Sequence, residues 1–569
     1  MKIKHFFGLA VLAAMTASCS SNDELANGGN GSGEVENGTA YASFKINLPT
    51  TSGTRAAGDP QGTPDFNEGT AAEYEVKNGT ILIFDKDGKF VESADLGTMN
   101  PWTDVQENGV TTAAIATVKL TKVSVSGTDK YKALVLLNNN TADDVTKKVT
   151  LPTASTDTYA NWSKDISKVN AVNYAKTDGI FMANAPMYNG TTTEPTTLVD
   201  IKGVYASPEE AQAKPATTIY VERGLAKVTM KDFKTGGYSI GGGTYDGATV
   251  KIEKWQLDVT NKSTYPVHQI GGLSSATTGF ADIWKTGRFY DGTSTAFQRV
   301  YWGVDPNYND AQYLDLAKCK TAFNMIKNKE VTGDAGEANP QYCLENTFDL
   351  DNMMQGQTTR VVFKAVFTPK GFTGTEKTFY KIGNNTDIWT EANLETQIHT
   401  VAVTAMGITD AAEQKLYKVK LDATKNNISG EAGQHLVKAE NITYTGEGES
   451  KVKEEVVNAI NDKLGLSEAA GISTYLNGEA YYIARIKHFN ELTPWKAGEA
   501  YSTDNGKYLG RYGVLRNNWY ELSVSSVSGL GYPDVPEVKP NLPDDENDQY
   551  INVSVKILSW AKRSQDVNL

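Results

Sequence analysis

The chain has few of the residues that usually build a catalytic or metal centre. Its 569 residues include three cysteines and five histidines. His5 lies in the amino-terminal leader, and the other four histidines are far apart in the sequence, so no pair has the spacing of metal ligands on a helix or hairpin. The P-loop and H-E-x-x-H patterns are also missing. We therefore expect no catalytic residue, no metal and no cofactor, and predict that the protein is not an enzyme.

Positive charge is in deficit. Lysine and arginine number 55 against 68 acidic residues, which gives a net charge of −13 at pH 7. A chain with this balance has no basic patch with which to neutralise phosphates. Nucleic acid is therefore not an expected partner.

The apolar run of the leader, residues 6–15, is too short to span a bilayer. It follows two lysines and is followed by small residues up to Cys19, which is typical of a signal peptide. The sequence "TASC" resembles the lipobox of bacterial lipoproteins, in which the cysteine carries the lipid. We assign residues 1–19 to a lipoprotein signal peptide ending at lipidated Cys19. The alternative is a plain secretory signal in which the cysteine is accidental.

Most of the remaining chain is typical of strands. Short apolar or alternating runs follow one another with glycine-rich turns between them, and only residues 313–329 and 451–466 favour helices. We predict an all-β fold with a few inserted helices, arranged as two tandem β-sandwich domains at 56–236 and 237–532. Ser239 is the centre of a G-x-S-x-G pattern, but a strand follows it instead of a helix, which favours a hairpin loop.

Two strands at opposite ends of the chain have the same alternation of apolar and polar residues. Each has four apolar residues on one face: Ala42, Phe44, Ile46 and Leu48 near the start, and Ile551, Val553, Val555 and Ile557 near the end. Leu558 and Trp560 break the second alternation, and either anchor the strand end or mark a bulge. The two strands could therefore replace one another in one position of a sheet.

A long polar loop follows the first of these strands. Arg55 is the one basic residue between Lys45 and Lys77, in a loop of the composition that proteases cut. We predict cleavage between Arg55 and Ala56, which makes residues 20–55 a propeptide with a removable strand. The alternative is that Arg55 is simply a loop charge.

The second strand follows a proline-rich segment. Four of the 18 prolines of the chain lie between Pro533 and Pro543. Such spacing favours an extended, semi-rigid chain. We assign 533–549 to an acidic linker that holds the strand segment, 550–569, away from the body. The alternative is an ordinary last strand that pairs within its own domain.

Cys319 and Cys343 are the cysteines outside the leader. Because the chain is exported, a disulfide between them is allowed. Two buried free thiols are the alternative.

In this order, the lipobox, the amphipathic strand, "TSGTRAA", "VERGLAKVTM", "VLRNNWYELSVSSVSGLG", the proline-rich linker and "INVSVKILSW" resemble the layout of the type V pilins of the Bacteroidales, in particular the stalk subunits of the minor (short) fimbriae. The resemblance spans the whole precursor. Its strongest parts are "RNNWYELSV" and the terminal strand.

The resemblance implies a sequence of maturation steps. A lipoprotein precursor reaches the outer membrane, an arginine-specific protease cuts after Arg55, and the first strand is lost. The C-terminal donor strand of another copy then fills the groove, which builds the stalk of a surface fimbrium that supports adhesion and biofilm formation. The implied partners are other copies, anchor and tip subunits, the protease, and host or bacterial surface receptors.

Two other readings are open. A tip or accessory subunit would be part of the same fimbria but lack either the donor or the cut site. A monomeric surface lipoprotein that binds glycans or host protein would keep both end strands in its own fold.

Overall fold

The computed structural model describes most of the chain after the leader. The described residues are 39–49, 69–97, 110–127, 130–141, 146–153, 156–174, 179–188, 196–231, 234–270, 298–299, 302–308, 311–326, 330–334, 339–349, 352–372, 377–421, 436–467, 470–488, 511–544 and 551–559. Within them, strands dominate and helices are few, so the predicted all-β fold with inserted helices is confirmed. No helix in these ranges is both long and apolar enough to cross a membrane.

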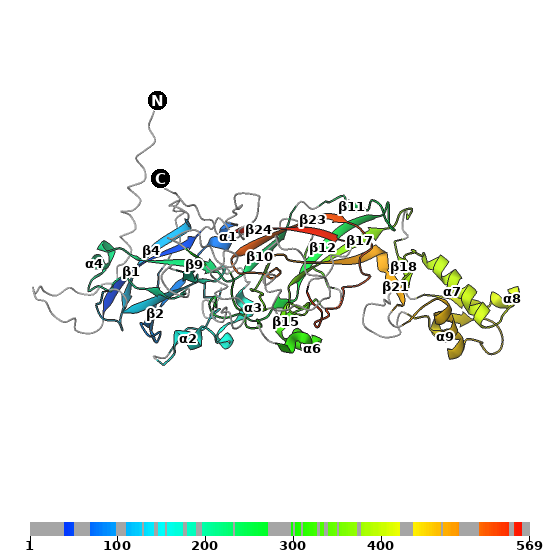
Figure 1. Ribbon diagram of the computed structural model, residues 1–569, viewed down its shortest axis with the longest axis horizontal. Coiled ribbons are helices and arrows are strands. Elements are labelled where there is room, and N and C mark those ends of the chain that lie inside the picture. The colour runs from blue at the N-terminus through cyan, green and yellow to red at the C-terminus, as the bar shows by residue number, and fades with distance from the viewer. Residues whose placement is uncertain are drawn as a thin grey trace, which may run out of the picture.

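The first half of the chain builds one eight-stranded sheet (Figure 1). Its strand order is β3-β2-β5-β6-β9-β1-β4, with β8 beside β5. The strands are β1 (Ala40–Pro49), β2 (Gly79–Asp85), β3 (Phe90–Asp95), β4 (Val110–Leu120), β5 (Tyr131–Leu137), β6 (Met182–Asn184), β8 (Val199–Asp200) and β9 (Thr217–Arg223). One core contains buried residues of β1 and β4 together with residues of β2 and β5. The two ends of the sheet therefore face one another as the layers of a sandwich do.

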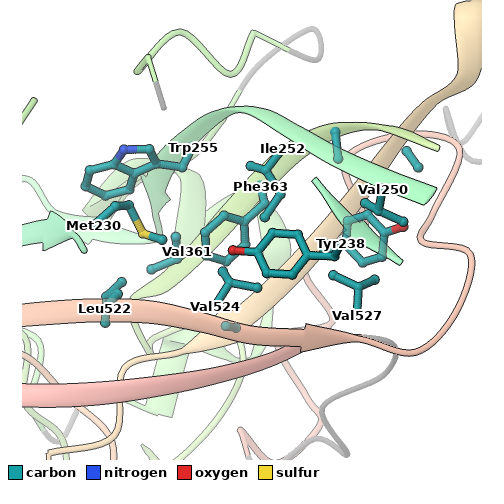
Figure 2. Packing of buried hydrophobic residues seen from close by; sticks show 14 of the residues in the cluster. Met230, Tyr238, Val250, Ile252, Trp255, Val361, Phe363, Leu522, Val524 and Val527 are labelled. Carbon is teal, nitrogen blue, oxygen red and sulfur yellow. The ribbon is translucent and has the colours of Figure 1, made fainter. Parts of the chain in front are cut away.

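The second half contains two four-stranded sheets that pack face to face. One has the order β16-β10-β23-β24 and the other β11-β12-β17-β22. Their strands are β10 (Ala226–Met230), β11 (Tyr238–Ser239), β12 (Thr249–Asp258), β16 (Gln341–Cys343), β17 (Arg360–Thr368), β22 (Glu479–Arg485), β23 (Asn518–Val527) and β24 (Ile551–Ser559). Side chains of β12 and β17 meet those of β23 in a shared core (Figure 2). The alternation of each strand supplies the buried face.

The chain passes from the first sheet to the second between β9 and β10, at residues 224–225. The sequence placed this boundary after residue 236. The difference arises because only two residues separate β9 from β10 in the sequence, and strand pairing alone places them in different sheets. The later stretch around Ser239 is the β11–β12 hairpin, as predicted.

Short elements connect and cover these sheets. They are α1 (Ala71–Tyr74), α2 (Tyr159–Trp162), η2 (Ile166–Lys168), α3 (Ala171–Tyr174), β7 (Met187–Tyr188), α4 (Pro208–Ala213), β13 (Thr260–Asn261), β14 (Gln298–Arg299), η4 (Ala311–Leu314), α6 (Leu316–Ala322) and β15 (Phe323–Asn324). The predicted helix at 313–329 is present in its middle part, as α6. Strands β7 and β14 pair with one another, as do β13 and β15.

A lobe with its own core is inserted between β17 and β22, at the end of the molecule opposite β1 (Figure 1). It consists of β18 (Phe379–Ile382), α7 (Glu391–Ala405), α8 (Ala411–Gln414), β19 (Tyr417–Val419), η6 (Ala439–Asn441), β20 (Ile442–Tyr444), α9 (Glu454–Lys463), β21 (Ile472–Tyr475) and η7 (Leu476–Gly478). Helix α9 confirms the prediction for 451–466. Helix α7 was not predicted, although Thr390 caps it and Leu394, Ile398 and Ala402 are buried at helical spacing.

Candidate strand-exchange site

Strand β1 lies inside the first sheet and is held along both of its edges. It pairs antiparallel with β4 along its whole length, from Ala40↔Leu120 to Leu48↔Thr112. On the other edge, residues 44–47 pair in parallel with β9. Nearer its start, the backbone N–H groups of Tyr41 and Tyr205 each donate to the other's carbonyl at 2.8 Å. Removing β1 would therefore leave a slot with hydrogen-bonding groups on two sides.

The apolar face of β1 is fully buried. Ala42, Phe44 and Ile46 have no exposed surface and Leu48 is 1% exposed. The strand β4 offers small residues opposite the larger ones: Phe44 is the register partner of Ala116, and Ile46 that of Ala114. The size of the side chains is thus complementary across this pair of strands.

The polar face of β1 is also largely covered. Ser43 and Asn47 are 7% and 3% exposed, and helix α4 contacts both β1 and β4. The hydroxyl groups of Ser43 and Thr117 lie 2.9 Å apart, within hydrogen-bond distance. Position 45 is only partly buried. The sequence predicted an exposed polar face, so the burial of two outward positions was missed.

The residues of the proposed processing steps lie outside the described ranges. These are Cys19, Arg55 and Ala56. What the structure adds is the placement of the segments on either side. Strand β1 ends at Pro49, and the described chain resumes at Gly69 before α1. A cut after Arg55 would separate β1 from every other described element.

Strand β24 pairs with β23 of its own chain. The register is antiparallel, from Val527↔Ile551 to Asn518↔Ser559, with an irregularity between Val524 and Ser526. Within the described residues β23 is its one strand neighbour, so β24 is an edge strand of its sheet. The bulge is therefore on β23 and not at the end of β24. Leu558 is the register partner of Trp519, and Trp560 lies outside the described ranges.

The described part of the proline-rich linker, 533–544, lies against the second domain. The Pro536 carbonyl accepts a hydrogen bond from Arg360 Nη2 at 2.6 Å. Asp544 is buried and accepts from the Thr358 hydroxyl at 2.9 Å, while Val538 is buried in a small core. The expectation that this segment holds the strand away from the body is therefore corrected. The linker is extended, but polar contacts fix it to the domain.

A buried ion pair fastens α1, the first helix or strand that the structure describes after β1. Glu73 in α1 lies 2.7 Å from Lys227 Nζ on β10, and each of these side chains is 4% exposed. The Lys227 ammonium also lies 3.5 Å from the ring centroid of Trp519 on β23. Desolvation tends to raise the pKa of Glu73, but hydrogen bonds from Lys227, Tyr342 and the Thr70 backbone outweigh it and hold that pKa below its usual value.

Sequence reasoning missed this pair. Glu73 and Lys227 are 154 positions apart. The one signal in the sequence was Lys227 at the centre of the run "GLAKVTM". A charge buried there would be costly without a partner, which indicates an acidic residue nearby in the fold.

The two cysteines are free and lie in different cores. Cys319 is buried near Tyr313, to whose carbonyl its thiol donates a hydrogen bond at 2.9 Å. Cys343 is buried in the core between the two second-domain sheets. Burial raises the pKa of Cys319 to about 11 and that of Cys343 to about 12. The structure thus shows the free-thiol alternative and no disulfide.

The histidines have ordinary partners. His268 Nδ1 lies 2.7 Å from Glu222 Oε1, and His488 Nδ1 lies 2.7 Å from the Tyr520 hydroxyl. His399 Nε2 lies 2.9 Å from the carbonyl of Gln414, and His435 lies outside the described residues. In the part of the chain that the structure describes, no three histidine, cysteine or acidic side chains form a group that could hold a metal ion.

The C-terminal strands match a known family. Residues 473–566, which include β22, β23 and β24, match the family model described as "Major fimbrial subunit protein type IV, Fimbrillin, C-terminal". This C-terminal part of the chain is of the fimbrillin type. The predicted resemblance is thereby confirmed, and a role of the protein as a fimbrial subunit is supported.

The solved structures that match this chain include several fimbrial proteins. A candidate cell adhesion protein from Parabacteroides distasonis is 12% identical, with 93% of this chain and 99% of that chain covered and a TM-score of 0.38. The tip fimbrial protein Mfa3 of Porphyromonas gingivalis, with a C-terminal truncation, is 10% identical, with 91% and 100% covered and a TM-score of 0.29. Comparison of the sequence with curated proteins finds no match.

Proposed function

We propose that this fimbrillin is the repeating stalk subunit of a surface fimbrium. It is exported as a lipoprotein through Cys19, cut after Arg55 by an arginine-specific protease, and polymerised when β24 of one copy fills the slot left by β1 of another. The observation that carries the proposal is the position of β1, an inner strand whose apolar face is buried although it lies on the far side of the cleavage loop.

The energetics support an exchange of strands. Burial of four large aliphatic side chains stabilises a strand in its slot by roughly 6–12 kcal/mol, at about 1.5–3 kcal/mol each. Ladder hydrogen bonds add about 0.5–1.5 kcal/mol each. An empty slot therefore has a strong tendency to bind a strand of the same pattern. Before the cut, β1 itself satisfies this tendency and prevents early polymerisation.

The position of slot and donor on one chain explains filament growth. The slot lies in the first sheet and the donor strand in the second domain. A contact between two different surfaces of identical copies does not close on itself, so it builds an open chain. Strand addition of this kind is a recurrent mode of binding between sheets and peptides. We propose that this filament assembles with anchor and tip subunits, binds surface receptors and supports biofilm formation.

A second candidate function has one specific observation in its favour. Strand β24 pairs with β23 of its own chain, as it would in a monomeric surface lipoprotein that binds glycans or host protein. In the stalk, β24 leaves this edge position, where one strand neighbour holds it, for a slot with neighbours on two sides. The two candidates thus differ in where β24 lies after cleavage.

Cleavage of the chain that begins at Ser20 distinguishes these candidates. We expect treatment with an arginine-specific protease to give a ladder of SDS-resistant multimers on unboiled gels, with Ala56 as the new N-terminus. Replacement of Arg55 with alanine, or deletion of residues 550–569, should abolish the ladder. A cleaved protein that remains a monomer with residues 40–49 bound would contradict the stalk proposal and favour the binding lipoprotein.

A further inference from the structure

The two exchangeable strands share more than their apolar alternation. When Ala40 is aligned with Ile551, the segments "AYASFKINL" and "INVSVKILS" have serine, lysine and isoleucine at the same places. Ser43 corresponds to Ser554, Lys45 to Lys556, and Ile46 to Ile557. The order of these residues is the same in both strands. The shared pattern therefore indicates a direction as well as a register.

We infer that the donor strand enters the slot in the direction and register of β1, with residue n + 511 of one copy at position n of the next. This inference rests on the proposed strand exchange. In this arrangement the donor is antiparallel to β4 and parallel to β9, as β1 is. Ser554 then takes the place of Ser43 beside the Thr117 hydroxyl, which is 2.9 Å from Ser43 in the precursor.

The burial of the polar-face positions of β1 distinguishes this register from one shifted by two residues. Shifting the donor by two residues aligns its four apolar residues with those of 42–48, but it moves Lys556 to the position of Asn47. That position is 3% exposed, and a lysine placed there would be a buried charge. In the inferred register, Lys556 instead takes the partly exposed position of Lys45.

Leu558 explains why the donor breaks its alternation. In the inferred register it takes the position of Asn47, whose side-chain Oδ1 is buried and has no hydrogen-bond partner among the described residues. An unsatisfied buried amide oxygen is unfavourable, whereas leucine gains from burial. The donor therefore suits this position better than the strand it displaces. This difference favours exchange in one direction.

The apolar side chains of the donor differ in size from those of β1 at several positions of the slot. The donor has a smaller residue than Phe44, because Val555 takes that position. It has larger residues than Ala40 and Ala42, since Ile551 and Val553 take theirs. At the end of the slot, Ser559 takes the buried position of Leu48, so the apolar bulk moves toward the start of the slot. Cores tolerate such changes when their total volume is kept.

Cysteine cross-linking between copies tests the register. Residues directly opposite one another on antiparallel strands have the separation that a disulfide needs. In β1, position 43 is opposite Thr117 and position 45 is opposite Ile115. We therefore expect Ser554→Cys to cross-link with Thr117→Cys, and Lys556→Cys with Ile115→Cys. After protease treatment and mild oxidation, both pairs should give a ladder that survives boiling and disappears on reduction.

The exchanged pairs are the matched controls. A ladder from Ser554→Cys with Ile115→Cys alone reports the two-residue shift discussed above, and one from Lys556→Cys with Thr117→Cys alone reports a two-residue shift in the other sense. Ladders from both pairs together report the opposite strand direction. A dominant ladder from either control pair would overturn the inference while leaving strand exchange intact. If no unboiled ladder forms even without engineered cysteines, the proposed function itself fails, and with it this register.

A second variant tests the role of Leu558. We expect Leu558→Asn to lower the temperature at which the unboiled ladder dissociates in SDS, because it returns a buried amide to the slot. Asn552→Ser, at the position of the partly exposed Tyr41, is the control and should leave that temperature nearly unchanged. Equal dissociation temperatures for Leu558→Asn and the unmodified chain would contradict the placement of Leu558 at position 47.

Discussion

Replacing Phe44 with alanine is expected to lower the free energy of unfolding of the uncleaved chain by about 3–5 kcal/mol. The Phe44 side chain has no exposed surface and belongs to the core of the first sheet. Its register partners, Ala116 and Thr217, are small and cannot fill the cavity that alanine leaves. Urea unfolding of the Arg55→Ala chain, with and without the change at position 44, measures the loss.

The same substitution should have no effect after maturation. Once β1 has been removed and a donor strand fills the slot, residue 44 is no longer part of the fold. Polymers made from the Phe44→Ala precursor should therefore dissociate at the same temperature as unmodified polymers. The matched control in the precursor is Lys45→Ala, which changes the neighbouring, partly exposed position and should cost much less. A destabilised polymer would show that β1 stays in the mature subunit.

Replacing Lys227 with methionine is expected to destabilise both precursor and mature chain by about 3–5 kcal/mol. Methionine keeps the approximate length of the side chain and its apolar stem. It removes the ammonium, so the Glu73 carboxylate stays buried without its cation. Because Glu73 lies in α1 and Lys227 in β10, the loss should also loosen the segment that follows the cleavage loop. Thermal unfolding of the two forms measures it.

The double variant Lys227→Met with Glu73→Gln separates lost charge from lost packing. It removes the unpaired carboxylate, so most of the stability should return. If the double variant is as unstable as Lys227→Met alone, the ion pair is not the source of the effect, and the contact of the lysine ammonium with the Trp519 ring is.

The ion pair also makes a prediction about acid. The pKa of Glu73 in the folded chain is below its ordinary value of 4.5. Its contribution to stability is therefore full above about pH 4.5 and is lost as the pH falls through the folded-state pKa. We expect the unfolding temperature of the unmodified chain to fall more steeply below pH 4.5 than that of the Lys227→Met, Glu73→Gln double variant. Parallel curves would contradict this.

Local features of the molecule were predictable from the sequence because short-range chemistry decides them. Asp-Gly between apolar runs is typical of a hairpin turn, and it lies in the β2–β3 turn, where Asp85 Oδ1 accepts from the backbone of Asp87 and Lys89. The hairpin at Ser239 and the stripe of α9 follow from turn residues and helical spacing in the same way. Helix α7 was missed because its valines and threonines have strand propensity, and only packing against the lobe core makes that segment helical.

The sequence by itself determined that both ends of the chain carry strands with one apolar face, because a period of two needs no knowledge of distant residues. The tertiary structure decided which strands lie beside them. It placed β1 between β4 and β9, laid the proline-rich linker against the second domain, paired β24 with β23, and buried Asn47 on a face that alternation predicts to be exposed. These outcomes depend on contacts between residues far apart in the chain, and a pattern of apolar residues says that a face is buried without saying against what.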